Sequence, residues 1–404
     1  MSANYREDRI LIKASEFQPE DVDRLNKILE DAGHGRPLRY PETGAPAAGS
    51  SGLVALTVTG ADPRAIRDAA RAHARQNGGE TPLVLDHHFS SGAAEQARDT
   101  DLIAAGLKSG HGTAAWLSAP DYEMPEQEPW RRLDRRPVIA LLDSGVQPHV
   151  WLPLPADGQA CVVDAAEAYG WPAPKLPEDP GPNDGNYGGR WGHATFIAGL
   201  IRLAAPDAQI LSMKVMSSIG QVSTCDVNHA LTWLVDHPQV GDSVDIVLMC
   251  FGRQTDADDS DLTPLKDPID ALSRRVQFVA SAGNDGSENP VYPAAFAAEP
   301  GSPVVSVGGL ASPTERAPGS NYGPWVQKWR KGSNVVSIMP LKTDKTGVIE
   351  QDPKLGFGPF HQDNTGDGFA WWDGTSFAAA IYAGQLAAQL QQPGPALPES
   401  AAGP

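Results

Sequence analysis

Cysteine is scarce in this chain of 404 residues, which holds only Cys161, Cys225 and Cys250. Because they are far apart and odd in number, they form neither a metal-type pair nor a disulfide framework, which favours a reducing compartment. No apolar run approaches the ~18 residues of a membrane-spanning helix, so we expect no membrane contact. The opening stretch MSANYREDRILIKASEF mixes acids with bases and lacks a secretory signal pattern. Together these absences predict a cytoplasmic location.

Positive charge is scarce as well. The chain has 32 Lys and Arg residues against 50 Asp and Glu, which gives a formal net charge of −18. Nucleic-acid phosphates are bound by Lys and Arg, so we expect no nucleic-acid partner. Hydrophobic residues make up 41% of the chain and charged residues 20%, which is ordinary for a globular protein of this length.

The apolar periodicity of residues 1–90 predicts a small domain of its own. Strand and helix patterns alternate in the order βαββαβ, which is typical of a ferredoxin-like α+β domain. The expected strands are 9–14, 37–40, 52–60 and 81–89, and the expected helices are 20–33 and 62–79.

From residue 137 onward, continuous apolar strands alternate with helices, and PVVSVGG and NVVSIM add two strands before the last helix. This pattern predicts a parallel sheet covered on both faces, in a three-layer α/β domain. We expect that domain over 137–393, after a linker at 91–136 and before a disordered tail at 394–404. Two long segments, 153–190 and 340–370, are expected to be irregular insertions.

Three side chains suited to catalysis fall at strand ends or helix starts. Asp143 follows the strand VIALL, His193 opens HATFIAGLI and Ser376 opens FAAAIYAGQL. A serine hydroxyl becomes a nucleophile when a histidine takes its proton and a buried carboxylate orients that histidine. Asn284, in ASAGNDG after another strand, offers an amide N–H to a developing oxyanion. Taken alone, each residue is explained as a turn, a helix cap or a surface group. Their occurrence together, in order along one sheet, favours catalysis.

Other hydrolase patterns are missing from the chain. An aspartic protease of this length needs a second Asp-Ser/Thr-Gly, but the sequence has only the one at 143–145. The Gly-x-Ser-x-Gly elbow and the His-Glu-x-x-His zinc motif are also absent. The acidic stretch 256–267 matches a calcium loop only in part, because its sixth position is Asp261 rather than glycine.

Four segments, VIALLDSGV, WGHATFIAGLI, VASAGNDG and DGTSFAAAIYAG, resemble the signature segments of subtilases, the subtilisin-like serine peptidases. The resemblance covers roughly residues 137–390. It implies that Asp143 orients the general base His193, that Ser376 is the nucleophile and that Asn284 lies in the oxyanion hole. It also implies peptide or protein substrates, no catalytic cofactor, and a propeptide-like domain at 1–90 acting as a partner in cis. Calcium is common in this family, but no ligands are assigned here and no metal residue is predicted.

The predicted substrate-binding edge follows two of the strands, where an extended peptide would add by main-chain hydrogen bonds. The small and apolar residues there favour a small or apolar side chain before the cut. The residues concerned are Cys250, Phe251, Gly252, Ala280, Ser281, Ala282 and Gly283.

Two positions depart from the family pattern. Ala194 stands where glycine usually follows the histidine, and it would crowd the turn if that position needs a positive φ. Ala380 replaces a proline and is expected to be harmless. The alternatives to a general endopeptidase are a silent or autoinhibited peptide-binding module and a processing protease dedicated to one partner peptide.

Overall fold

The computed structural model describes residues 5–14, 17, 21–40, 52–79, 83–90, 115–117, 135–149, 151–152, 160–174, 176, 192–217, 220–255, 262–340 and 369–390. The chain divides into two compact units. The first holds residues 1–90, 221–241 and 255–274, and the second holds 91–220, 242–254 and 275–404. Each unit has its own sheet and its own core.

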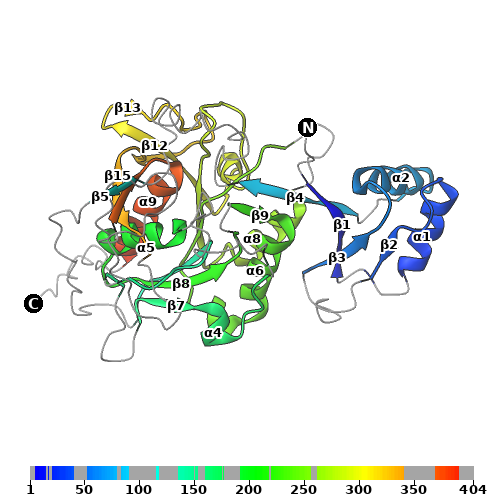
Figure 1. Cartoon of the computed structure of the whole chain (residues 1–404), viewed down its shortest axis with the longest axis horizontal. Coiled ribbons are helices and arrows are strands. Elements are labelled where there is room, and N and C mark those ends of the chain that lie inside the picture. The colour runs from blue at the N-terminus through cyan, green and yellow to red at the C-terminus, as the bar shows by residue number, and fades with distance from the viewer. Residues whose placement is uncertain are drawn as a thin grey trace, which may run out of the picture. The chain divides into compact units, whose positions relative to one another are not determined.

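The N-terminal part of the first unit has the predicted βαββαβ order (Figure 1). Its antiparallel strands lie in the order β2-β3-β1-β4, the arrangement of a ferredoxin-like domain. Its elements are β1 (Tyr5–Lys13), α1 (Asp21–Asp31), β2 (Leu38–Arg39), β3 (Leu53–Val58), α2 (Pro63–Gln76) and β4 (Val84–Ser90). Helix α2 begins where the sequence signals a start, because the Asp62 carboxylate accepts the Arg64 N–H at 2.9 Å and Pro63 occupies the first turn.

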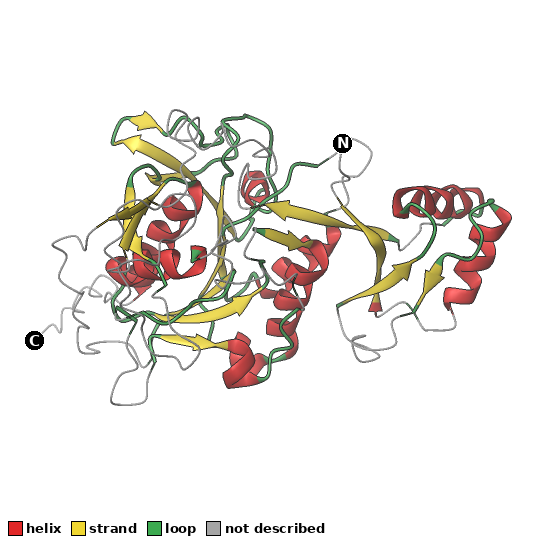
Figure 2. Ribbon diagram, in the orientation of Figure 1, coloured by secondary structure: helices red, strands yellow, loops and turns green. Residues whose placement is uncertain are grey.

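Both faces of this sheet are covered, as Figure 2 shows with α1 and α2 on one side and α6 on the other. Ile10 and Ile12 of β1 join the core under α1 and α2, whereas Leu11 between them packs with Cys225. Successive side chains of a strand point to opposite faces, so one apolar strand serves both cores. The elements contributed from later in the chain are β9 (Gln221–Ser223), α6 (Thr224–Asp236), α7 (Pro238–Gly241) and α8 (Thr263–Leu272).

A buried polar contact joins β1 and β4 to the start of α6. Strand β4 pairs antiparallel with β9, with His88 opposite Ser223. The carboxylate of Asp86, fully buried, accepts the Cys225 N–H at 3.0 Å and forms an ion pair with Arg9 at 2.5 Å. Asp86 therefore satisfies a free N–H of the helix start while its own charge is balanced by Arg9.

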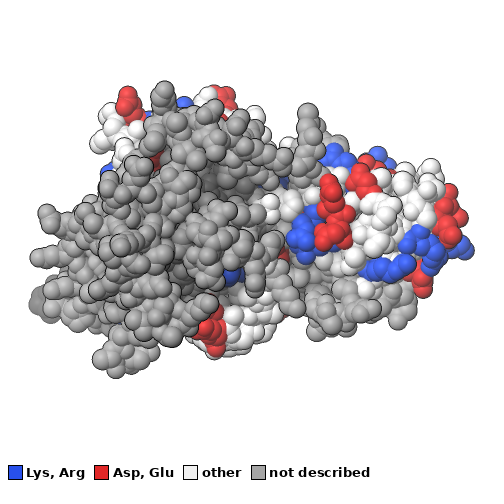
Figure 3. Space-filling model, in the orientation of Figure 1, with Lys and Arg blue, Asp and Glu red and all other residues white. Residues whose placement is uncertain are grey.

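Other charged side chains of the first unit are accessible to solvent, unlike the buried Asp86. Figure 3 shows acidic and basic side chains interspersed over the N-terminal elements. Among them, Arg6 pairs with Asp8 at 3.0 Å, with both side chains accessible to solvent. Such a pair is screened by water and contributes little to stability.

The second unit is built on a sheet in the order β13-β12-β11-β10-β6-β8-β7, with β14 paired to β12. The six strands from β12 to β7 in that order run parallel, as predicted. The strands are β6 (Val138–Asp143), β7 (Val162–Asp164), β8 (Gln209–Lys214), β10 (Ile246–Met249), β11 (Gln277–Ser281), β12 (Val304–Ser312), β13 (Glu315–Arg316) and β14 (Lys328–Lys331). Its helices are α4 (Ala165–Tyr169), α5 (His193–Ala204), the 3₁₀ helix η4 (Ala294–Ala298) and α9 (Thr375–Leu390).

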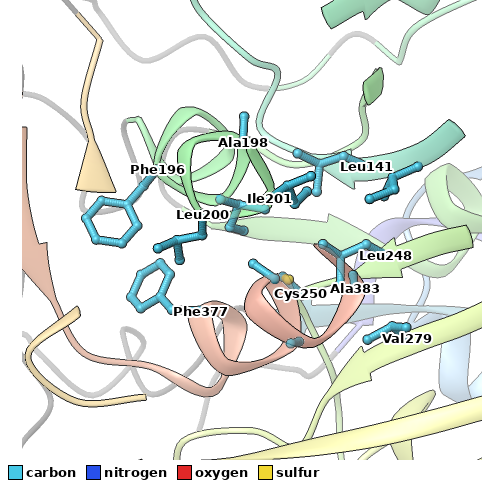
Figure 4. Packing of buried hydrophobic residues seen from close by; sticks show 14 of the residues in the cluster. Leu141, Phe196, Ala198, Leu200, Ile201, Leu248, Cys250, Val279, Phe377 and Ala383 are labelled. Carbon is cyan, nitrogen blue, oxygen red and sulfur yellow. The ribbon is translucent and has the colours of Figure 1, made fainter. Parts of the chain in front are cut away.

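Helices α5 and α9 lie against each other and against the sheet. Figure 4 shows Phe196 and Leu200 of α5 facing Phe377 of α9, with Cys250 and Leu248 to their right. A Cβ at Gly384 would lie 2.7 Å from the Ala204 Cβ and 3.1 Å from the Ile201 carbonyl oxygen. The missing side chain at Gly384 thus allows the two helix backbones to approach closely.

Two expectations for this unit need correction. Part of the segment expected to be irregular, 153–190, is regular, since it contains β7 and α4. Asp164 caps α4 through the Ala166 N–H at 2.8 Å, and Gly170 ends it with φ 69°. The strand at NVVSIM, β15 (Val335–Ile338), forms a separate antiparallel sheet with β16 (Phe369–Trp372) and β5 (Ala115–Leu117). Segment 341–368 and the tail 391–404 lie outside the described residues.

Within the described ranges, the helices are too short or too polar to cross a bilayer.

Replacing Gly384 by alanine should destabilise the second unit by about 1–3 kcal/mol, because the added methyl group overlaps α5. The change runs against the helix propensity of alanine, which alone would stabilise α9 by about 1 kcal/mol. Thermal unfolding measures the sum. Gln389→Ala, at an exposed position of the same helix, is the control and should leave Tm nearly unchanged. A Tm for Gly384→Ala at or above that of the parent chain would show that the helices have room to spare.

Candidate active site

Asp143 and His193 are brought together by the end of a strand and the start of a helix. Asp143 is the last residue of β6 and His193 the first of α5. Gly192 caps that helix with φ 76°, and a Cβ there would lie 2.6 Å from the Pro340 Cδ. Only glycine avoids both the backbone strain and the clash, so this residue fixes where the histidine begins its helix.

The two side chains form a buried hydrogen-bonded pair. The His193 Nδ1 lies 2.9 and 3.0 Å from the two carboxylate oxygens of Asp143, and the residues are 1% and 0% exposed. The Ser144 N–H donates to the same carboxylate at 2.7 Å. A carboxylate accepts hydrogen bonds, so the proton of the neutral imidazole lies on Nδ1 and Nε2 carries the lone pair. The ring centroids of Trp372 and Phe377 lie 5.6 and 5.7 Å from the centroid of the imidazole ring, and the two aromatic rings shield the imidazole from water.

Ser376 lies in the first turn of α9, directly before Phe377. Its Oγ donates to the Cys250 carbonyl at 3.4 Å, and the Cys250 Sγ lies 3.5 Å from the Ser376 carbonyl oxygen. Burial raises the pKa of the Cys250 thiol well above its usual value, and the neighbouring Asp143 charge raises it further. The thiol therefore stays protonated and unreactive. A hydrogen bond from Ser376 to His193 remains a prediction, because the hydroxyl points to Cys250 here.

Asn284 is oriented by the residue that precedes the serine. Its Oδ1 accepts the Thr375 N–H at 2.8 Å and the Thr375 hydroxyl at 3.0 Å. The same hydroxyl accepts the Gly283 N–H at 3.1 Å. With the oxygen of the amide turned to Thr375, its NH2 group is directed away from Thr375. The loop after β11 and the start of α9 thus hold each other through one threonine.

Asn321 is a positioning residue that the sequence analysis did not identify. It is 0% exposed, and its Nδ2 donates to the Ala282 carbonyl at 3.0 Å. Its Oδ1 accepts the N–H groups of Asp285 and Ser287 at 2.9 and 3.1 Å. A single side chain therefore fixes the loop that carries Asn284. The sequence held only a weak signal, an asparagine in the loop SNYGPW, where side-chain to backbone bonds are common.

The predicted substrate-binding residues lie at the ends of two adjacent strands. Met249 of β10 is in register with Ala280 of β11, and Cys250–Gly252 and Ala282–Gly283 follow directly after these two strands. Ala280 and Ser281 belong to β11 and pair with β12, which engages their main chain in the sheet. A substrate-binding role for this set stays a prediction.

The two departures from the family pattern are accommodated without strain. Ala194 lies inside the right-handed helix α5, and the positive φ falls on Gly192 instead, so the expected crowding does not occur. Ala380 is buried in the core on α9.

Within the described part of the chain, no three His, Cys, Asp or Glu side chains gather as they would around a metal ion. The acidic stretch 256–267 is described only from residue 262.

A buried aspartate–histidine pair, with Ser376 in the first turn of the helix whose Phe377 ring lies near that histidine, is compatible with a serine hydrolase. The family model described as "Subtilase family" matches residues 134–401. The chain belongs to the subtilase family, whose catalysis needs no cofactor.

Individual relatives are distant. The chain is 26% identical over 215 residues to Subtilisin Savinase of Lederbergia lenta, which covers 51% of this chain and 67% of that protein. An alkaline protease of Alkalihalobacillus alcalophilus matches at the same identity and length, covering 47% of its own length. The chain thus spans about half to two thirds of these curated relatives.

Two solved structures have a low overall likeness. A cold adapted subtilisin-like serine proteinase aligns over 63% of this chain and 76% of its own, with 21% identity and a TM-score of 0.42. A lanthipeptide protease aligns over 62% and 72%, with 22% identity and a TM-score of 0.43.

Substituting Asn321 by alanine should free the loop that carries Asn284. We expect the amides of Asp285 and Ser287 to lose hydrogen-exchange protection, and the free energy of unfolding to fall by about 1–3 kcal/mol because buried partners are left unsatisfied. Asn289→Ala, in the same loop but with an exposed side chain, is the control and should change neither. Unchanged protection in Asn321→Ala would mean that the loop is held by other contacts.

Proposed function

We propose that this chain is a serine endopeptidase in which Ser376, His193 and Asp143 act together. The observation that carries the proposal is the buried Asp143–His193 pair, with both carboxylate oxygens within 3.0 Å of Nδ1, next to a helix that has Ser376 in its first turn. Membership of the subtilase family supports the same assignment.

The first step requires a small movement of the serine hydroxyl. The contact between the Ser376 Oγ and the Cys250 carbonyl is long, at 3.4 Å, so rotation about one side-chain bond costs little. The hydroxyl then donates to Nε2 of His193, which takes the proton as Oγ attacks the peptide carbonyl. Asp143 holds the Nδ1 proton and stabilises the imidazolium that forms. The imidazolium gives its proton to the leaving amine, and water hydrolyses the acyl-enzyme.

The negative charge on the attacked oxygen would be held by two donors. The Asn284 NH2 group is one, because its carbonyl oxygen is engaged by Thr375. The Ser376 N–H is the other, at the positive end of α9. Both donors are fixed before substrate arrives, which avoids a reorganisation cost during the reaction.

A serine-reactive fluorophosphonate probe tests the proposal on the full chain. We expect labelling of the parent chain and of Ser273→Ala, an exposed serine outside the site. Labelling should vanish in Ser376→Ala, and peptide hydrolysis should fall by about 10⁴-fold or more. His193→Ala should lose both signals as well. Labelling that survives in Ser376→Ala would refute the assignment of the nucleophile.

One observation favours a second candidate function, an autoinhibited or silent peptide-binding module. Ser376 is only 2% exposed, and its hydroxyl is engaged by Cys250. In that case the parent chain would bind peptides but resist the probe.

A protease dedicated to one partner peptide would react with the probe but leave general protein substrates intact.

We further propose that residues 1–90 regulate the peptidase region of the same chain. The support is their packing against α6 and the pairing of β4 with β9, both from the region that matches the family. A cytoplasmic location remains part of the proposal, and the three buried cysteines, which form no disulfide bond, agree with a reducing compartment.

Loss of the Asp86 charge should weaken this packing. Asp86→Ala leaves the partly exposed Arg9 without this ion-pair partner and removes the bond to the buried Cys225 N–H, so we expect a loss of about 1–3 kcal/mol of stability. Cys225, buried beneath Leu11 and Val84, should then react faster with a thiol reagent. Asp8→Ala, which breaks an exposed pair, should cost less than about 1 kcal/mol and leave thiol reactivity unchanged. Equal effects of the two substitutions would argue against the Asp86 contact as a docking determinant.

A further inference from the structure

The turn that follows Asp143 is joined to the first turn of α5 by two hydrogen bonds of opposite direction. In the first, the Ser144 hydroxyl accepts the Ala194 N–H at 3.3 Å. In the second, the Thr195 hydroxyl oxygen accepts the Gln147 N–H at 2.9 Å. Each segment therefore supplies one side-chain oxygen to a main-chain N–H of the other.

The start of α5 takes its capping oxygen from outside the helix. Its N-cap residue, Gly192, has no side chain and makes no capping hydrogen bond. The first N–H groups of a helix have no partner within it, so the Ser144 hydroxyl does for Ala194 what an N-cap side chain would otherwise do. The turn after Asp143 is thus part of the helix start that carries His193.

Thr195 places a hydroxyl at a position where packing alone does not call for one. The residue is fully buried in the first turn of α5. Threonine is a weaker helix former than alanine or leucine, because its branched side chain loses rotamer freedom. The bond to the Gln147 N–H accounts for the hydroxyl, since it gives the oxygen a partner in another segment.

A second hydroxyl holds the same turn against the sheet. Ser212 of β8 is buried, and its Oγ accepts the Val146 N–H at 3.1 Å. Two consecutive N–H groups, those of Val146 and Gln147, are therefore bound by β8 and by α5. Of these two bonds, only the one to Thr195 joins the turn to the helix of His193.

From these contacts we infer that Thr195 is a positioning residue, whose hydroxyl keeps the Asp143 carboxylate at hydrogen-bond distance from His193. The inference rests on the proposed peptidase activity. The two segments could pivot about the carboxylate–imidazole contact if it were their only link, and the Thr195 bond is the shorter of the two that prevent this. Without it the carboxylate would hold the Nδ1 proton less well and stabilise the imidazolium less during the reaction.

Thr195→Val keeps the shape of the side chain and removes its oxygen, so it tests the inference on the full chain. We expect kcat for peptide hydrolysis to fall by about 10- to 100-fold, because misplacing a catalytic group by about 1 Å can cost on the order of 100-fold in rate. KM should stay nearly unchanged, since the contact acts on the reaction step and not on substrate binding. Thr195→Ser, which restores a hydroxyl, should regain most of the activity. Thr195→Ala is the second variant if Thr195→Val does not fold.

Proton NMR gives a readout that does not depend on turnover. The Nδ1 proton shared by His193 and Asp143 should resonate far downfield, because its acceptor is a charged carboxylate. Its absence in His193→Ala assigns the resonance. In Thr195→Val we expect it to move upfield and to exchange faster with water, and in Thr195→Ser to return to its position in the parent chain.

The matched control is Ser337→Ala, because the buried Ser337 hydroxyl also contacts α5, where it donates to the Phe196 carbonyl at 2.7 Å. It should lower Tm without changing kcat or the resonance. An unchanged kcat and resonance in Thr195→Val would overturn the inference, and so would a loss that Thr195→Ser does not restore.

Fluorophosphonate labelling of the parent chain separates these results from failure of the proposed function. A chain that takes up the probe but shows no response to Thr195→Val refutes this inference alone. A chain that takes up no probe, while its Nδ1 proton responds to Thr195→Val, refutes the proposed function and supports the positioning role. A chain with neither the probe signal nor the downfield proton refutes both.

Discussion

The parallel register of β6, β10 and β11 sets the position of those groups in the candidate site that lie at or beyond the ends of these strands. In-register pairing of these strands makes them end at one edge of the sheet, where Asp143, Cys250 and the loop bearing Asn284 emerge together. Helix α9 then approaches α5 closely enough, across Gly384, to bring its first turn to the same edge. The position of the site thus depends on the backbone hydrogen bonds between the strands and on the absence of a side chain at Gly384.

Two polar side chains fix the loop that follows β11 at this end of the sheet. Thr375 links the loop after β11 to the start of α9, and Asn321 secures the same loop from a segment further along the chain. Neither needs to touch a substrate. By engaging buried N–H and C=O groups they prevent the loop from satisfying those groups in another conformation, which keeps the Asn284 amide oriented.

The sequence predicted those parts of the molecule that depend on local pattern. Asp143 and His193 were placed correctly because a strand end and a helix start are visible in periodicity, and their contact follows from the sheet. The βαββαβ order of residues 1–90 was visible for the same reason. Asn321 could not be found this way, since its importance lies in contacts with residues 34 to 39 positions away. In the sequence Asp86 cannot be told from a surface acid, because its burial depends on Arg9 and the start of α6, which lie far from it along the chain. Strand β7 and helix α4 are short and lie in a stretch rich in proline and glycine, so their periodicity is weak, although Asp164 and Gly170 mark the ends of the helix.

The first unit combines residues 1–90 with two segments, 221–241 and 255–274, of the region that matches the family. Their sheet is covered by α1 and α2 on one face, but its other face is closed by Cys225 of α6. Separating the two parts would expose Leu11, Leu53 and Val84 on one side and the first turn of α6, with its Asp86 cap removed, on the other. Hydrophobic burial opposes that separation, and so does the buried ion pair. A domain held in this way is stabilised by the helix it covers and stabilises that helix in turn. Single substitutions in the contact, which leave both parts present, therefore separate regulation from folding more cleanly than removal of residues 1–90.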